Sequence, residues 1–335
     1  MRIYATLYSL ENKIQRTGRK NRIHSNSPFA DFLEIKQLNN INTRTMLATA
    51  LSLLLRILSN PIGNVFQKKL TEKQNHPLLV NFLTFFILSI LCIIPAWQLD
   101  WKQVPLHSWY YGIIAGIFGA AGNGLLVKAL QGGDLSILGP INSYKSVVGI
   151  LIGIIFLHEI PNIWGIIGIV LIIYGSYFVL DTMEEHFSWA LLRNKEIQYR
   201  IWAMILTAIE AIFIKKVILY SSTTISFFFW CWFGAFFSFV LLFCFKVHFP
   251  KELKKIKYSH LPMYGLLVLC IGTMQYTTNY VFSHMNVGYS LALFQLSTIV
   301  SIILGYKIFK EQNIKKKLLG AIVMVVGSIV IIMLN

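Results

Sequence analysis

The sequence has little charge, and acidic residues are especially few. Charged residues make up 13% of its 335 positions, about half of the roughly 25% that is usual in soluble domains. Only 14 residues are Asp or Glu, against 30 Lys or Arg, which gives a formal net charge of +16. The basic residues gather in the first 44 positions and between apolar runs. We therefore expect contact with membrane lipid and no nucleic-acid partner.

Motifs for metal, cofactor or ATP chemistry are also missing. The four cysteines lie inside apolar runs without CxxC spacing, so we expect neither a disulfide framework nor a metal site. The sequence contains no GxxxxGK[ST] loop and no HExxH, and its histidines are mostly unpaired and outside the apolar runs. A membrane-embedded enzyme acting on lipid or peptide is the alternative class, but these absences disfavour it. We expect no cofactor and no enzymatic activity.

Long apolar runs dominate what is present, since 56% of the residues are hydrophobic. About 20 apolar residues in a helix cross the hydrocarbon core of a bilayer. Ten such runs occur, at about 46–66, 78–97, 109–128, 135–157, 163–180, 201–219, 224–245, 262–282, 287–308 and 316–334. The sequence thus predicts an all-α polytopic protein with ten transmembrane helices, in a bacterial inner membrane.

Two segments lie outside these runs. Residues 1–44 are polar and basic, with no apolar stretch long enough for a signal peptide, and we expect them to be disordered. Because Met46 stands directly before the first run, this extension is either a cytoplasmic arm or a start-site artefact. Residues 181–200 form a polar linker between a first half, 45–180, and a second half, 201–335.

The two halves repeat each other. A shift of 152 residues superimposes Gly153 on Gly305, Glu159 on Glu311, Gly168 on Gly320, Gly175 on Gly327 and Ser176 on Ser328. A shift of 147 aligns "FQKKL" at 66–70 with "FIKKV" at 213–217. Because each half has an odd number of spans, the second half must enter the membrane from the opposite side. Such inverted repeats are typical of transporters, in which the substrate site lies near the midplane between the halves.

These repeats carry a family resemblance. Each half closes with a glutamate nine residues before a glycine, in "HEIPNIWGIIG" at 158–168 and "KEQNIKKKLLG" at 310–320, and Pro140 comes early in the fourth span. In this the chain resembles the EamA-like members of the drug/metabolite transporter superfamily. One departure is that Ala292 occupies the position that matches Pro140.

The resemblance implies a secondary transporter. It would move a small metabolite, such as an amino acid or organic acid, or an amphipathic drug, by alternating access coupled to protons or to exchange. The expected partners are this small-molecule substrate, membrane lipid and a second copy of the chain.

Three ionisable residues lie near the middle of apolar runs, namely Arg56, Lys145 and Glu210. Such residues usually face the bundle interior or a water-filled cavity. Lys145 is either a structural tie neutralised by Glu210 or the cation that binds an anionic substrate group. Glu210 is either a proton carrier or a fixed counter-ion. Arg56 would suit a carboxylate or phosphate through its forked guanidinium, and together the three would favour a carboxylate-bearing substrate.

Neighbouring polar residues complete the predicted site. Asn142 shares a helix face with Lys145, and Thr298 matches Ser146 of that face in the second half. Asn123 and Gln275 form a matched pair under the repeat. Asn64 lies in the first run, where Asn60 and Pro61 suggest a broken or kinked helix.

Two further stretches receive structural interpretations. The aromatic run "FFFWCWF" at 227–233 is expected to face lipid. Glu159 and Glu311 are expected to cap the fifth and tenth helices, which follow them directly.

Overall fold

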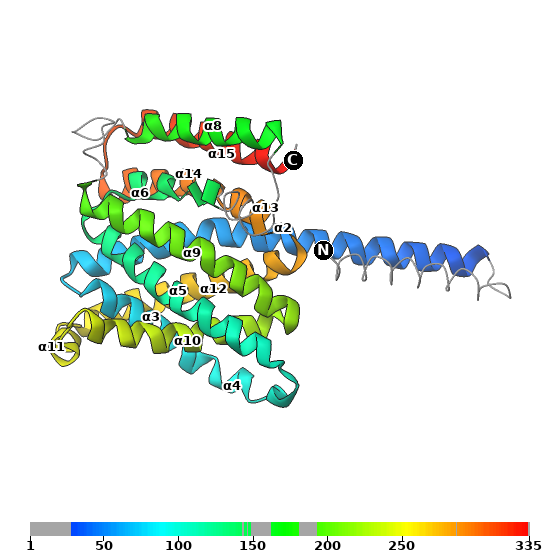
Figure 1. The fold of residues 1–335 in the computed structure, drawn as a ribbon, viewed down its shortest axis with the longest axis horizontal. Coiled ribbons are helices and arrows are strands. Elements are labelled where there is room, and N and C mark those ends of the chain that lie inside the picture. The colour runs from blue at the N-terminus through cyan, green and yellow to red at the C-terminus, as the bar shows by residue number, and fades with distance from the viewer. Residues whose placement is uncertain are drawn as a thin grey trace. The chain divides into compact units, whose positions relative to one another are not determined.

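The computed structural model describes residues 28–142, 144–145, 147–148, 162–180, 193–285 and 287–333, and this part of the chain contains helices and no strands (Figure 1). The chain divides into two compact units, residues 1–50 and 51–335. In the first unit, helix α2 (Pro28–Glu72) begins at Pro28. Residues 28–44, which we expected to be disordered, are therefore helical.

The remaining helices follow the apolar runs closely. After α2 the first half contains α3 (Pro77–Leu91), α4 (Ile93–Ala96), the 3-10 turn η1 (Trp101–Gln103), α5 (Leu106–Gly132), α6 (Leu135–Ile141) and α8 (Ile163–Leu180). The second half contains α9 (Lys195–Tyr220), α10 (Thr223–Cys244), α11 (Phe249–Lys254), η3 (Tyr258–His260), α12 (Leu261–His284), α13 (Val287–Leu293), α14 (Leu296–Phe309) and α15 (Ile314–Met333).

Polar residues in the short loops begin several of these helices. The Asn194 side chain accepts a hydrogen bond from Ile197 N at 3.1 Å, which caps α9. Ser222 caps α10 by accepting from Ile225 N, also at 3.1 Å. Each cap satisfies one of the amide groups that the first turn of a helix leaves unpaired. The loops can therefore stay short while the apolar segments on either side remain helical.

Three described helices are long and apolar enough to cross a membrane by length and composition, namely α5, α10 and the Thr43–Glu72 part of α2. Helices α3, α8 and α14 are apolar but shorter. Helices α4, α6, α11 and α13 are too short to span, and among the longer ones α9 contains charged residues such as Glu210 and α12 polar residues such as Gln275. All ten predicted runs contain helix, but ten transmembrane spans remain a prediction.

The helix that follows α5 in the first half, and its counterpart that follows α12 in the second half, are interrupted at the same place. Helix α6 ends at Ile141, and α13 ends at Leu293, which stands 152 residues later. At both sites a tightened backbone bond spans three residues, from Lys145 N to Asn142 O at 3.0 Å and from Ser297 N to Phe294 O at 3.1 Å. Because Ala292 replaces Pro140 in the second half, the proline is not required for the interruption.

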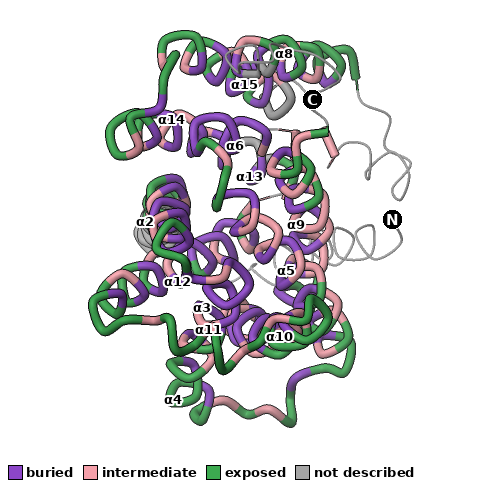
Figure 2. The backbone as a smooth tube through the Cα atoms, turned by 90° about the vertical axis from the view of Figure 1, so that its left-hand side faces the viewer, coloured by how far each residue is buried: buried purple, intermediate pink, exposed green. Residues whose placement is uncertain are grey.

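Within residues 51–335, helix α8 packs against its repeat counterpart α15, and α6 packs against α14. Helices α3, α5, α9, α10 and α12 pack together beside them (Figure 2). Glycines allow the close approach of α8 and α15, because a Cβ atom on Gly175 would lie 2.6 Å from Gly320 O. A Cβ on Gly327 would lie 2.7 Å from Gly168 O. Only glycine fits at such positions without a backbone shift.

The aromatic run in α10 lies in the core rather than toward lipid. Phe228, Phe229, Trp230 and Cys231 are all buried, and Trp230 packs on Phe85 with their ring centroids 4.5 Å apart. The expectation of a lipid-facing surface was therefore wrong for the middle of this run. The reason is that α10 contacts α3, α5, α9 and α12, so little of its circumference is left for lipid.

Candidate functional site

A polar cavity lies inside the helix bundle formed by residues 51–335. Its solvent-accessible volume is about 70 Å³. It is lined by Arg56, Asn60, Asn64, Asn123, Leu126, Asn142, Lys145, Arg200, Thr207, Glu210, Ala211, Ile214, Met274, Gln275, Thr278, Phe282, Leu291 and Phe294. Residues of both halves contribute to it. Seven of the eight side chains named as site candidates from the sequence line this one cavity.

The eighth candidate lies elsewhere. Thr298 is buried in α14 and is not among the lining residues. The interruption between α13 and α14 explains the difference, because it brings Leu291 and Phe294 to the cavity wall instead. We expected one continuous helix over 287–308 from the sequence, and such a helix does not predict which residues face the cavity after the interruption.

One face of α2 supplies three polar residues to the cavity. Arg56, Asn60 and Asn64 follow each other at intervals of four residues, which places them on one stripe of an α-helix. The helix continues through Pro61 without a break, so of the broken and kinked alternatives the broken first span is not formed. The cavity is polar here because side chains, rather than freed backbone groups, face it.

Arg56 is a buried cation with no polar partner among the residues that the structure describes. Its residue is only 7% exposed, and its Nε and Nη1 atoms have no hydrogen-bond acceptor in the described part of the chain. The guanidinium carbon lies 4.2 Å from the centroid of the Phe294 ring, which is a favourable cation–π distance. The ring holds the guanidinium in place but leaves its hydrogen-bonding capacity unused.

Among the described residues, Glu210 is the only acidic residue in the cavity wall, and it already has a donor. The Trp230 Nε1 atom donates to Glu210 Oε1 at 2.6 Å, and both residues are buried. Gly119 of α5 makes room for the carboxylate, because a Cβ atom at that position would overlap Glu210 Oε1. The carboxylate is therefore fixed between α5, α9 and α10.

Lys145 lines the cavity just after the interruption of α6, together with Asn142. Among the described residues, the ion pairs involve Lys68, Lys255 and Lys317 but not Lys145. No direct ion pair therefore joins Lys145 to Glu210 among the described residues, and whether the lysine is a structural tie stays a prediction. The role of Lys145 as a substrate ligand stays a prediction.

Arg200 is a cavity residue that sequence reasoning missed. It is 6% exposed, and its Nε donates to Leu138 O at 2.7 Å. That carbonyl is available because Asn142 N bonds to Gly139 O instead, in the tightened turn that ends α6. The sequence offers little signal for it, because residue 200 lies ten positions before Glu210, which is about 80° around an α-helix.

Two amides complete the polar lining. Asn123 Nδ2 donates to Gly119 O at 2.9 Å, one turn earlier in α5. The side-chain amides of Gln275 and Asn279 lie 2.9 Å apart on α12. The repeat pairs Asn123 with Gln275, and both line the cavity.

Comparison with known proteins agrees with this architecture. The sequence profile described as the EamA-like transporter family matches residues 45–181 and again residues 194–333. This chain belongs to the EamA-like transporter family. Members of that family are multi-pass membrane transporters of the drug/metabolite transporter superfamily.

Individual proteins similar to this EamA-like chain add the fold and little about function. An uncharacterized protein of Methanocaldococcus jannaschii is 32% identical over 117 residues, which make up 34% of this chain and 82% of that protein. A solved crystal structure covers 86% of this chain and 96% of its own, with a TM-score of 0.59 and 16% identity. At that identity the similarity shows the fold alone.

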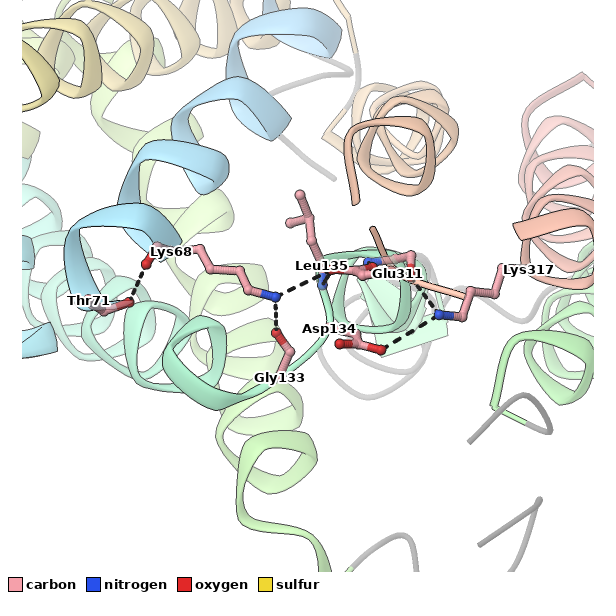
Figure 3. A network of polar contacts seen from close by, with 8 residues as sticks. Lys68, Thr71, Gly133, Asp134, Leu135, Glu311 and Lys317 are labelled. Carbon is pink, nitrogen blue, oxygen red and sulfur yellow. Dashed lines mark hydrogen bonds and ion pairs between the residues drawn. The ribbon is translucent and has the colours of Figure 1, made fainter. Parts of the chain in front are cut away.

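A second polar cluster joins the two EamA repeats away from the cavity (Figure 3). Glu311, which follows α14, accepts hydrogen bonds from Leu135 N and Ser136 N, both at 2.8 Å. It thereby caps α6 of the first repeat rather than α15, so the expectation for this glutamate named the wrong helix. Glu159, its counterpart, lies outside the described residues.

Two lysines extend this cluster. Lys68 of α2 lies 3.4 Å from Glu311 Oε1 and donates to Gly133 O at 2.9 Å. Lys317 of α15 donates to Ser136 Oγ at 2.8 Å and lies 3.7 Å from Asp134 Oδ2. Lys68, Glu311 and Lys317 are all buried. The cluster thus ties α2 and α6 of the first repeat to the α14–α15 connection of the second.

Proposed function

We propose that this protein is a secondary transporter that moves a small polar solute through the central cavity by alternating access. The observation that carries the proposal is the cavity itself, where four ionisable side chains from both repeats meet inside an apolar bundle. Ionisable residues within a membrane bundle mark substrate or ion pathways, because placing them there has a high free-energy cost. In a family of transporters, such a cavity is the natural substrate site.

The packing supports an inverted repeat. Helices α5 and α12 are the third spans of the two halves, and α3 and α10 are the second spans. Helix α5 contacts α10, and α12 contacts α3, so each third span packs on the second span of the other half. Lys68 donates to the carbonyl of Gly133, at the end of α5, and Lys215 donates to the carbonyl of Met285, at the end of α12. The first pair of residues becomes the second under the two sequence shifts. The helix contacts cross between the halves and are reciprocal, as a two-fold relation requires, whereas each of the two hydrogen bonds lies within one half and supports the repeat itself.

The same relation supports ten spans rather than three. Helices α8 and α15 contact through their matched glycines, in the reciprocal pairs Gly168 with Gly327 and Gly175 with Gly320. If one helix of such a pair crosses the membrane, its partner does as well. Short or interrupted spans such as α6 and α13 are common at transporter sites, where they line the cavity.

Glu210 is the candidate for coupling, because no other carboxylate lines the cavity in the part of the chain that the structure describes. In a proton-coupled carrier the carboxylate takes up a proton on one side and releases it on the other. Glu210→Gln fixes a neutral side chain of the same shape. We expect the variant to lose accumulation driven by a pH gradient and to keep solute exchange. If both activities persist, the carboxylate is a fixed counter-ion.

Reconstitution into liposomes tests the proposal as a whole. Solutes that raise the unfolding midpoint of the purified protein are assayed for saturable counterflow of a labelled copy into preloaded liposomes. We expect counterflow that empty liposomes lack and that Lys145→Ala reduces. Chemical conversion of the solute without flux would instead favour the membrane-enzyme alternative, and an absence of both would contradict the proposal.

A further inference from the structure

We propose that the solute held in the cavity is a small carboxylate or phosphate anion, and that Arg56 is its principal ligand. This inference rests on the proposed function, because it names the class of substrate for the same cavity. The argument uses the charge of the cavity wall, the hydrogen-bond partners of each cation and the space available.

The cavity wall has more positive than negative charge. Arg56, Lys145 and Arg200 face a single carboxylate, Glu210. That carboxylate accepts a hydrogen bond from Trp230 and lies within ion-pairing distance of none of the three cations. Buried charge without a counter-charge is strongly unfavourable. An anionic ligand would offset the surplus, whereas a cationic drug would increase it.

The two arginines differ in their freedom to bind a ligand. Arg200 uses its Nε on Leu138 O, at 2.7 Å, and so stabilises the end of α6. Arg56 has no such partner in the described part of the chain, and two of its nitrogens are buried and unsatisfied. A native structure rarely leaves a buried donor unsatisfied unless the group has a functional partner.

The geometry of Arg56 suits an anion with paired oxygens. A guanidinium presents parallel N–H groups that match a carboxylate or phosphate in a two-bond arrangement. The Phe294 ring, 4.2 Å from the guanidinium carbon, restrains the group without occupying its donors. Because Phe294 lies at the interruption between α13 and α14, the second repeat orients a ligand-binding group that the first repeat supplies.

The size of the cavity limits the anion. One water molecule needs roughly 10–15 Å³ of accessible volume, so the cavity volume of about 70 Å³ corresponds to about five water-sized spheres. This favours anions with few heavy atoms, such as lactate, malonate, succinate or inorganic phosphate. Large amphipathic compounds do not fit the cavity in this conformation.

The test compares ligand-induced thermal stabilisation of the purified full-length protein with that of two charge-removing variants. The probes are the four anions just named, each with a matched neutral or cationic compound such as lactamide, succinamide or putrescine. Arg56→Met removes the cavity guanidinium and keeps an apolar side chain of similar length. Lys216→Met is the control, because Lys216 is exposed and outside the cavity wall.

We expect at least one anion to stabilise the wild type and the Lys216→Met variant equally. In Arg56→Met we expect the apparent affinity for that anion to fall at least tenfold, as charge-assisted hydrogen bonds are lost. We also expect Arg56→Met without ligand to unfold at a higher temperature than the wild type, because an unpartnered buried charge is gone. A structural arginine would give the opposite change in the unfolding temperature.

Three results would overturn this inference: stabilisation by cationic or neutral probes alone, no response to any anion, or an anion response that Arg56→Met retains. Liposome flux separates this inference from the proposed function. Flux of a neutral or cationic solute without an anion response would leave a transporter and overturn the anion assignment. Anion binding that depends on Arg56, without flux of any solute, would leave the binding site and overturn transport.

Discussion

His76, at the start of α3, links the stability of the protein to pH through a single hydrogen bond. Its Nδ1 atom accepts a hydrogen bond from Leu78 N at 3.3 Å and so caps the helix. Burial lowers the pKa of His76 below its usual value of 6.5, Lys128 and Lys255 lower it further, and Glu252 opposes the shift. The neutral, capping form is therefore favoured in the folded protein.

The lowered pKa predicts a pH-dependent contribution to stability. Because the folded-state pKa lies below the unfolded-state value, the contribution is complete above about pH 6.5 and is lost as pH falls through the folded pKa. His76→Asn keeps a capping oxygen without a titrating ring. Relative to this variant, the wild type should lose about 0.5–1 kcal/mol of unfolding free energy on acidification. Unfolding midpoints measured from pH 8 to pH 5 check this, and parallel curves would contradict it.

For single residues, the sequence predicts which side chains face the cavity better than it predicts their hydrogen-bond partners. The mid-run charges Arg56, Lys145 and Glu210 were placed together because their cost in a membrane makes an inward orientation almost obligatory. Arg200 was missed because it stands at the edge of a run, where a cation usually faces water. Whether an arginine ends on a carbonyl, as Arg200 does, or remains unpaired, as Arg56 does, depends on backbone turns in other helices.

At the scale of helices, the cluster around Glu311 should be an energetically coupled unit. Lys68→Met or Glu311→Gln leaves a buried partner unpaired, and each should destabilise the protein by about 3–5 kcal/mol. The double variant should cost less than the sum of the two, with an interaction energy of about 1–3 kcal/mol. Denaturation of the four proteins measures this cycle.

An exposed ion pair provides the control for that cycle. Lys255 and Glu252 are 2.6 Å apart, but the Lys255 side chain is 51% exposed. The same cycle with Lys255→Met and Glu252→Gln should give an interaction energy of about 0–1 kcal/mol. Equal coupling energies at the two sites would mean that burial of the Glu311 cluster contributes nothing.

The contact between α8 and α15 should depend on its glycines. In Gly175→Ala the new methyl group would lie 2.6 Å from Gly320 O, so the helices must separate, at a cost of about 1–3 kcal/mol. Gly265 of α12 is the matched control, because nothing lies within 4 Å of a Cβ atom there. Gly265→Ala should stabilise by up to about 1 kcal/mol through helix propensity. Thermal unfolding of both variants distinguishes these opposite signs.

Helix positions followed from the apolar runs, whereas the interruptions and caps did not. The first span contains Pro61 and remains continuous, while α13 ends at Leu293 without a proline. Glu311 caps a helix of the other half instead of the helix that follows it. The cap joins segments more than 150 residues apart, which periodicity within one segment cannot reveal.

At the scale of the whole molecule, the repeat is the feature that the sequence predicted most fully. Two of the glycine pairs that superimpose under the 152-residue shift, Gly168 with Gly320 and Gly175 with Gly327, make the contact between α8 and α15. The reason is geometric, because a two-fold contact requires the same small residue on both sides. Lys68 and Lys215, paired by the 147-residue shift, likewise make equivalent hydrogen bonds.

An inverted repeat makes a definite prediction about topology. Gln74, in the loop after α2, matches Ser221, in the loop after α9, under the 147-residue shift. If the halves are inverted, these two loops lie on opposite sides of the membrane.

Cysteine labelling tests this topology. In a variant without Cys92, Cys231, Cys244 and Cys270, Gln74→Cys and Ser221→Cys are introduced singly. A membrane-impermeant maleimide applied to intact cells should then label only one of the two, and permeabilised cells should allow labelling of both. Labelling of both in intact cells would place the two loops on the same side, which would require an even number of spans between them and would end the inverted-repeat interpretation.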